Sequence, residues 1–464
     1  MTGALLIRNA EINGFGRRDL LISAGRIAAI GSGLRAGNVE EIDAEGGALL
    51  PGLHDHHIHL LALAAEAESL SLGPAASLST AQFTALLVDA ATRSGPEGWV
   101  RVTNYDESFA GLLDRWRIDA IIPDRPVRIQ HRTGALWVLN SRGLLEILAA
   151  GSDAIPDCVE RNAAGELTGR IWRGDIWLRE RLPIRPPNLR DVGAALCRSG
   201  ITAVTDTSAS TTQVQANLLA TAVRSGALPQ RLTLMSAGPL DATEDSAYRV
   251  GAVKFLLDDA DLPDIEEVCA KVGDARRQGR AVAFHCVTTT QLAFVLAVFG
   301  TTGAEPGDRI EHGAVILAET IAELARLGVT IVTQPGFVHG RGNRYLREME
   351  PQELSSAWRC GSLLRAGVPV LAGSDAPYGS PDPWRGMASA VTRRTASGAE
   401  FGADERITPA RALRLYSGGK KLAVGQRADL CLLPLPIRLA LSRLPENLVA
   451  ATIIGGRIVY RVED

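Results

Sequence analysis

The chain lacks the features that would direct it to a membrane, to nucleic acid or out of the cell. No apolar run in its 464 residues approaches the ~20 residues that a membrane-spanning helix needs. Its first residues, MTGALLIRNAEING, have no basic stretch followed by a long apolar one, so we expect no signal peptide. Basic residues (49) and acidic residues (52) nearly balance at a net charge of −3, and no long block of one sign occurs. The charge pattern therefore gives no reason to expect nucleic acid or an anionic membrane as a partner.

Cysteine and aromatic residues are scarce as well. The six cysteines are scattered without a CxxC pair, which is typical of reduced thiols in a cytoplasmic protein. Aromatic residues make up 5% of the chain, whereas hydrophobic residues make up 46% and glycine occupies 47 positions. This composition indicates a large, tightly packed α/β core with many short turns.

The two ends of the chain read as short strands. Residues 1–50 contain ALLIRNAEI and RDLLISAGRIAAIG, and residues 424–464 contain RADLCLLPL and RIVYRVED. In these segments apolar residues recur near period two and are interrupted by glycine and asparagine turns. We therefore predict one small β-sandwich domain that is built from both chain ends.

The middle of the chain, residues 51–423, alternates short apolar runs with Ala/Leu-rich helical stretches. The predicted strands are LLPGLHDH, PVRIQH, GITAVTD, AVKFLLDD, AVAFHC, DRIEHG, GVTIVTQ and GVPVLAGSD. Eight strand–helix alternations favour a (β/α)₈ TIM barrel. Residues near 60–125 and 135–195 are longer than barrel connections need and are expected to form insertions. The strand-like run RLTLMSAG at 231–238 has no secure place in this scheme.

Four of the eight histidines lie within the six residues HDHHIH at 54–59. His57 and His59 are two positions apart, and residues i and i+2 point to the same side of a strand but not of a helix. A strand therefore turns this H-x-H pair into a chelator. Neutral imidazole suits zinc and other transition metals, and zinc is the usual choice for hydrolysis. A histidine-rich loop without metal is the alternative.

Further groups of the same kind stand at the ends of later predicted strands. His285 ends AVAFHC, His312 ends DRIEH, and Asp375 follows VLAGS, while Lys254 lies inside AVKFLLDD. TIM-barrel enzymes carry their chemistry at the carboxyl ends of the strands. Together with the H-x-H pair, these residues predict a metal centre at one mouth of the barrel.

The motifs PGLHDHHIH, RIEH, GSDAPYG, TQPGF and GQRADL resemble those of the amidohydrolase superfamily. Within it, the chain is most similar to the branch that includes N-substituted formamide deformylases (amidohydrolase family 3), and the resemblance extends over nearly the whole sequence. It implies two divalent metal ions, expected to be zinc. It also implies that His57, His59 and Asp375 are ligands of one ion, that His285 and His312 are ligands of the second, and that an N-carboxylated Lys254 bridges them. The alternatives are a salt-bridged Lys254 and a purely structural Asp375.

The expected activity is hydrolysis of an N-acyl, N-formyl or cyclic amide by a hydroxide that two metals ~3.5–4 Å apart share. Asp375 would accept the proton and pass it to the departing nitrogen. A deaminase, or an esterase or lactonase of the same superfamily, is the alternative, and a non-catalytic barrel scaffold is a more remote one. We expect a small-molecule substrate and a homodimer. The residues predicted to bind substrate are His131, Arg132, Asn140, Gln334 and Arg341.

Overall fold

The computed structural model describes residues 4–37, 39–72, 79–93, 98–151, 154–182, 187–242 and 247–462. The chain divides into two compact units, one formed by Met1–Leu60 with Leu189–Asp464 and the other by Leu61–Asn188. We refer to them as the barrel unit and the second unit and describe each by itself. Among the described residues, no helix has the length and hydropathy that crossing a bilayer would require.

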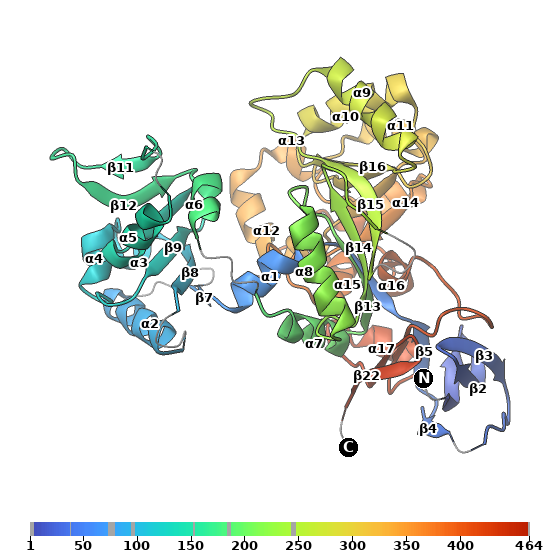
Figure 1. The fold of residues 1–464 in the computed structure, drawn as a ribbon. Helices are drawn as coiled ribbons and strands as arrows, with labels where there is room; N and C mark the ends of the chain where they lie inside the picture. Colours follow the sequence, from blue (N-terminus) through green and yellow to red (C-terminus); the bar gives the residue numbers. More distant parts are fainter. Residues whose placement is uncertain are drawn as a thin grey trace. The chain divides into compact units, whose positions relative to one another are not determined.

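An eight-stranded parallel sheet forms the centre of the barrel unit. Its strands, in sheet order, are β6 (Leu53–Ile58), β13 (Ile201–Asp206), β14 (Arg231–Ser236), β15 (Tyr248–Phe255), β16 (Val282–Cys286), β17 (Arg309–His312), β18 (Thr330–Thr333) and β19 (Val370–Ala372). Helices α8 (Gln213–Arg224), α9 (Ile265–Arg277), α10 (Thr289–Thr302) and α11 (Ile321–Leu327) connect successive strands, and most of them are labelled in Figure 1. The remaining helices of this unit are α7 (Arg190–Arg198), α12 (Gly336–Glu348), α13 (Pro351–Leu354), α14 (Gly361–Arg365), α15 (Pro383–Thr392), α16 (Pro409–Ser417) and α17 (Ile437–Ser442), with short 3₁₀ turns η1 (Ala318–Thr320) and η2 (Ala403–Glu405). The fold is a (β/α)₈ barrel, as predicted.

The first and last barrel strands meet through the segments that follow them. The Asp375 N–H donates to the His57 carbonyl at 2.7 Å, and the His59 N–H donates to the Ala376 carbonyl at 2.9 Å. A Cβ at Gly373 would lie 2.5 Å from the backbone nitrogen of His57, so only glycine permits this approach. Closure of the barrel thus brings the H-x-H segment of β6 against the Asp375 loop.

Local signals in the sequence explain where the helices begin and end. Helix α16 begins after Thr408, whose side chain accepts from the Arg411 N–H, carries Pro409 in its first turn, and ends at Gly418 in the left-handed conformation. These are the preferred residues for an N-cap, a first turn and a C-cap. Helix α9 begins at the Asp264 cap and has acidic residues in its first turn and arginines in its last, which matches the helix dipole.

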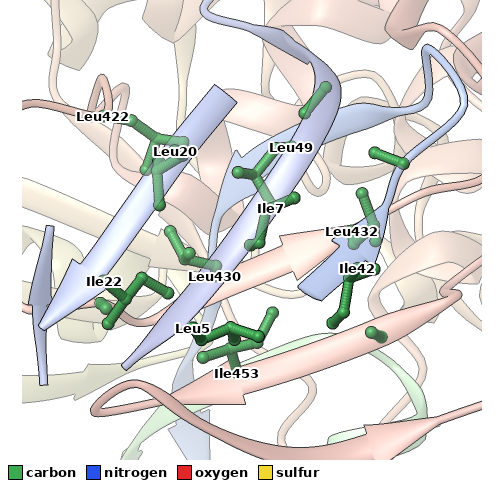
Figure 2. Packing of buried hydrophobic residues seen from close by; sticks show 14 of the residues in the cluster. Leu5, Ile7, Leu20, Ile22, Ile42, Leu49, Leu422, Leu430, Leu432 and Ile453 are labelled. Atoms are coloured by element: carbon green, nitrogen blue, oxygen red, sulfur yellow. The ribbon is translucent and has the colours of Figure 1, made fainter. Parts of the chain in front are cut away.

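Strands from both chain ends join in a second sheet of eight strands in the barrel unit. They are β1 (Leu5–Ile12), β2 (Phe15–Ser23), β3 (Arg26–Gly31), β4 (Glu40–Asp43), β5 (Ala48–Pro51), β20 (Leu430–Leu432), β21 (Ala451–Ile454) and β22 (Arg457–Arg461). We call this the terminal sheet. β5 pairs parallel to β1 and antiparallel to β20, which joins the two chain ends. Leucine, isoleucine and alanine side chains form its core, shown in Figure 2. The proposed sandwich and the predicted domain boundaries stay predictions.

The second unit contains its own six-stranded sheet, with the order β11-β12-β10-β9-β8-β7. Its elements are β7 (Leu70–Ser71), α2 (Thr80–Arg93), β8 (Val100–Tyr105), α3 (Glu107–Ala110), α4 (Arg115–Asp119), β9 (Val127–His131), β10 (Leu136–Leu139), α5 (Ser141–Ala149), β11 (Val159–Arg161), β12 (Leu167–Trp172) and α6 (Asp175–Arg181), and helix α1 (Leu60–Ala67) leads into it.

The six-stranded sheet of the second unit corrects the prediction for one strand. PVRIQH was predicted as a barrel strand, but it forms β9, which pairs with β8 and β10 in the second unit. RLTLMS, which had no secure place, is the barrel strand β14 between β13 and β15. The error has a simple cause: a short apolar strand has the same period of two in either sheet, and the pattern does not reveal its neighbours.

Candidate metal centre

The six predicted metal ligands all lie in the barrel unit, at or near the carboxyl ends of its strands. His57 is in β6 and His59 follows its last residue. Lys254 and His285 lie next to the ends of β15 and β16, respectively, His312 ends β17, and Asp375 comes three residues after β19. Because the strands are parallel, these ends share one mouth of the barrel.

Four of these side chains converge most closely. Ligand atoms of His57, His312 and Asp375 lie within 4.8 Å of one another. Asp375 Oδ1 is 3.1 Å from His59 Nε2 and 3.4 Å from His57 Nε2. The His312 ring neighbours two other histidine rings: its centroid lies 4.6 Å from that of His57 and 4.7 Å from that of His285. The structure therefore gathers the predicted histidines and the aspartate in one place.

Two of the predicted ligands have left-handed backbone. His312 has φ of 69° and Asp375 has φ of 54°. Residues other than glycine rarely adopt this conformation, which costs of order 1 kcal/mol, and such residues cluster at functional sites. Both residues stand at or just beyond the carboxyl end of a barrel strand.

Hydrogen bonds hold the imidazoles by their Nδ1 atoms. His57 Nδ1 lies 2.5 Å from Glu311 Oε2, and His312 Nδ1 lies 2.8 Å from Gln334 Oε1. Both partners are acceptors, so each Nδ1 is the donor, and in the neutral ring Nε2 presents a lone pair. His59 Nδ1 has Ser208 Oγ at 2.8 Å. This second layer of contacts is the arrangement that orients histidine ligands toward a metal.

Glu311 is a functional residue that the sequence reasoning missed. Its side chain is fully buried and also accepts from Arg309 Nε at 2.5 Å and Nη2 at 3.0 Å. Burial opposes its charge, but Arg309, Lys254 and His57 outweigh burial and hold the pKa of Glu311 well below its usual value. The motif RIEH could have indicated this residue, because a carboxylate buried in an apolar barrel strand must be paired with a charged or hydrogen-bonding group.

Asp55 fixes the backbone of the same region. Its Oδ1 accepts the N–H of His57 at 3.1 Å and the N–H of Ser374 at 2.9 Å. The carboxylate thus links the H-x-H strand to the segment that carries Asp375. His54 and His56 stack on each other at 3.9 Å between ring centroids, and His54 Nε2 lies 2.9 Å from Thr205 Oγ1, so both pack away from the ligands.

The electrostatics of the site act differently on its predicted ligands. Burial opposes the charged form of His57, but Glu311 and Asp375 outweigh burial and raise the pKa of that imidazole. Burial lowers the pKa of His285 to about 4 and of Lys254 to about 8. Burial also raises the pKa of Asp375, but the His57 and His59 imidazoles beside its carboxylate outweigh burial and hold that pKa well below the usual value. A neutral imidazole and a carboxylate are therefore available near neutral pH, and part of the Lys254 population is uncharged.

Of the predicted substrate residues in the barrel unit, Gln334 and Arg341 lie on this side of the barrel. Gln334 is fully buried and holds His312. Arg341, on α12, donates to the Tyr378 carbonyl at 2.6 Å and stacks at 4.2 Å on the Phe337 ring. The Tyr378 ring lies 6.0 Å from that of His59, which places Arg341 beside the Asp375 loop. Substrate binding by either residue stays a prediction.

His131, Arg132 and Asn140 belong to the second unit. His131 contacts Thr133 at 2.8 Å and Glu107 at 3.0 Å, and Arg132 pairs with Asp106; their substrate roles stay predictions. Asn140 is fully buried, and its amide makes four hydrogen bonds, to Val127, Gly143, Ile122 and Arg125. These bonds use the whole capacity of the side chain. Substrate binding by Asn140 stays a prediction, and a substrate would have to displace one of these bonds.

The donor set fits a divalent metal. Lys254 Nζ and Asp375 Oδ1 are buried without a hydrogen-bond partner among the described residues, although unpartnered buried polar atoms are costly. Imidazole nitrogens with lone pairs turned inward and a carboxylate oxygen are the ligands that zinc and similar ions prefer. A bound cation would satisfy the Asp375 oxygen and the inward-facing imidazole nitrogens together. The barrel and this site define the class of metal-dependent hydrolases.

Comparison with known proteins gives the family. A model of the amidohydrolase family matches residues 40–460, and the chain belongs to this family. It is a hydrolase that acts on carbon–nitrogen bonds, so the resemblance inferred from the sequence is confirmed.

Individual relatives cover nearly the whole chain. An N-substituted formamide deformylase of Arthrobacter pascens is 26% identical and covers 98% of both chains. The putative amidohydrolase YtcJ of Bacillus subtilis (strain 168) is 24% identical over 91% of this chain and 90% of its own. Among solved structures, an uncharacterized metal-dependent hydrolase from Pyrococcus horikoshii OT3 matches with a TM-score of 0.76 at 20% identity, over 96% of this chain and 99% of that chain, which shows the shared fold.

Proposed function

We propose that the protein hydrolyses the C–N bond of a small N-acyl, N-formyl or cyclic amide at a centre of two divalent metal ions, most simply zinc. The observation that carries the proposal is the convergence of His57, His312 and Asp375 ligand atoms within 4.8 Å. The deformylase relative supports the substrate class, since that enzyme is named for its action on N-substituted formamides.

His57, His59 and Asp375 would hold one ion, and His285 and His312 the other. When bound, such ions lower the pKa of water to about 7 and polarise a carbonyl oxygen. Glu311 keeps the proton of His57 on Nδ1, and Gln334 does the same for His312. The protein thereby fixes both ligand tautomers before a substrate arrives.

Asp375 has the position and charge for proton transfer. Its carboxylate is ionised at neutral pH, because its pKa is held well below the usual value. As a base it would take a proton from the attacking water, and as an acid it would return that proton to the departing nitrogen. His57 and His59 on one side, and the hydrogen bond from the Asp375 N–H to the His57 carbonyl, keep the carboxylate in place.

Lys254 supplies the observation that favours two ions over one. Its side chain is 3% exposed, and its Nζ has no hydrogen-bond partner among the described residues. Burial lowers its pKa to about 8, so the neutral amine is accessible. That amine would add to carbon dioxide, form an N–C bond and lose a proton, and the resulting carbamate would give the site a further anionic group to hold the ions. A deaminase of the same superfamily would normally need one ion and no such carbamate.

The experiment is an activity profile of the metal-loaded enzyme against N-formyl, N-acyl and cyclic amides, with matched esters and amino-heterocycles as the other arms. Turnover of an amide at least tenfold above the best ester and best amino-heterocycle supports the proposal. Preferred release of ammonia from an amino-heterocycle would make the protein a deaminase instead, and preferred ester cleavage would make it an esterase or lactonase.

The state of Lys254 has its own measurement. ¹³C NMR after exposure to labelled bicarbonate should show one carbamate carbon in the wild type and none in Lys254→Gln. Lys271→Gln is the matched control, because Lys271 lies on α9 outside the site. A wild-type protein with two bound ions and no carbamate signal would contradict the bridging role.

A further inference from the structure

A cavity of about 530 Å³ lies in the barrel unit between the terminal sheet and two helices. Strand β5, helix α16 and helix α17 line it. β5 immediately precedes β6, so the cavity lies beside the amino end of the strand whose carboxyl end carries His57. It is therefore separate from the candidate metal centre.

The surface of the cavity is mostly apolar, and aliphatic side chains contribute to it from each of these elements. They include Leu50 and Pro51 from β5, Leu413 from α16, and Ile437 and Leu441 from α17. The volume falls within the ~300–1,000 Å³ that is typical of small-molecule sites, which are concave and mostly apolar with a few polar groups. An open apolar hollow of this size has to be wetted or filled, and filling it with an aliphatic ligand is favourable.

Four basic residues line the same cavity: Arg414, Lys420, Lys421 and Arg438. None of them makes an ion pair with a described residue. The concentration of positive charge is unusual in this chain, whose net charge is −3 and which has only four lysines, two of them at this cavity.

One carboxylate, that of Glu11, belongs to the lining and is already engaged. Glu11 Oε2 accepts the N–H of Ile437 at 2.7 Å, at the start of α17. The carboxylate therefore leaves most of the positive charge around the cavity uncompensated. Charges of one sign around a low-dielectric hollow raise the local concentration of the opposite charge.

We propose that this cavity binds an amphipathic anion, namely an aliphatic chain with a singly or doubly charged acidic head. The chain would pack against Leu50, Leu413 and Leu441, and the head would meet Lys420 and Lys421. A carboxylate and a phosphate monoester share this chemistry, since both are oxyanions that lysine and arginine bind. The site is independent of the proposed amide hydrolysis.

The probes are decanoate, decyl phosphate and decanol, each titrated into the full-length protein by calorimetry below its micelle concentration. We expect one mole of decanoate or decyl phosphate to bind per mole of chain, and decanol to bind at least tenfold more weakly. The anion that binds with the higher affinity identifies the head group. Raising the salt concentration should weaken the two anions and leave decanol nearly unchanged.

Two variants separate the contributions of charge and shape. K420A/K421A should reduce anion affinity about tenfold or more, to near the decanol value, because it removes half of the basic residues that line the cavity. L413W should weaken the anions and decanol alike, because the larger ring occupies the cavity. Lys271→Ala on α9 is the matched control for charge and should bind like the wild type.

Circular dichroism of each variant shows whether it is folded, and K420A/K421A concerns exposed residues whose removal does not touch the core. Equal affinity for decanoate and decanol in the wild type would overturn the proposal. Unchanged anion binding in folded K420A/K421A would do so as well, and so would binding of several chains per protein, as in non-specific adsorption.

Discussion

The terminal sheet and the mouth of the barrel are both buried, yet they are built from opposite chemistry. The core of the terminal sheet consists of leucine, isoleucine and alanine (Figure 2). The mouth instead buries ionisable groups, among them His57 (1% exposed), Lys254 (3%) and Glu311 (0%). Apolar burial stabilises a fold by about 25 cal/mol per Å², whereas burial of charge costs free energy unless the charge is paired.

The comparison shows which region maintains the fold and which one performs the chemistry. A protein that needed only stability would fill the mouth with aliphatic side chains, because these would be at least as stable there. The retained charges, together with left-handed backbone at His312 and Asp375, mark a region where stability is given up for function. Substitutions in the two regions should therefore separate activity from stability.

The largest effect is expected for Asp375→Asn. The substitution preserves size and suits the left-handed backbone at this position, since asparagine tolerates that conformation. It removes the proton acceptor, so kcat should fall by about a thousandfold or more, while the midpoint of thermal unfolding stays equal or rises. Steady-state kinetics and thermal denaturation on the same sample check both parts. Activity within tenfold of the wild type would remove Asp375 from the proton-transfer role.

The reverse pattern is expected for Leu430→Ala. Leu430 is fully buried in β20, between β5 and β21. The free energy of unfolding should fall by about 2–5 kcal/mol, while kcat per folded molecule stays unchanged. Chemical denaturation measures the first and active-site-normalised kinetics the second. The control Leu439→Ala, at a residue that is 54% exposed, should change stability by less than about 0.5 kcal/mol.

Glu311→Gln should lower the affinity for metal more than it lowers the free energy of unfolding. The carboxylate fixes the His57 tautomer through its contact at 2.5 Å, and loss of such a partner lowers metal affinity by about 10–100-fold. Competition with a chelator measures this affinity directly. Glu323→Gln on α11 changes the same chemistry at a surface ion pair and should leave affinity unchanged. Equal affinity in both variants would contradict the positioning role of Glu311.

The smallest effect belongs to an exposed charge pair. Arg326 Nη2 lies 3.8 Å from Glu323 Oε1 on the surface of α11, and exposed pairs of this kind contribute about 0–1 kcal/mol. Arg326→Met should therefore change neither the metal content nor kcat, and it should shift the free energy of unfolding by less than about 1 kcal/mol. A larger loss would show that charge at the surface contributes to stability, unlike charge at the mouth.

Much of the candidate site could be predicted from the sequence, because its chemistry is repeated at strand ends. The H-x-H spacing of His57 and His59 and the polar residue that ends or follows an apolar run at His312 and Asp375 are local features, readable within a few residues. The barrel follows from the same alternation of strands and helices.

The rest depends on contacts that no local pattern contains. His57, the histidine that Glu311 holds, lies 254 positions away in the sequence. The role of Glu311 therefore becomes visible only when β6 and β17 face each other. The strand PVRIQH was predicted in the wrong sheet, because the alternation of apolar and polar residues does not reveal which strand it will pair with. The four hydrogen bonds of the Asn140 side chain could likewise be counted only in the structure.

The measurement that most directly tests the central claim is the metal content of the purified protein by elemental analysis, beside that of His57→Ala and His312→Ala. A centre built from these converging side chains predicts two divalent ions per chain in the wild type and a clear loss in each folded variant. A wild-type chain that binds no stoichiometric metal at any concentration short of precipitation, or variants that retain the full content, would contradict the account.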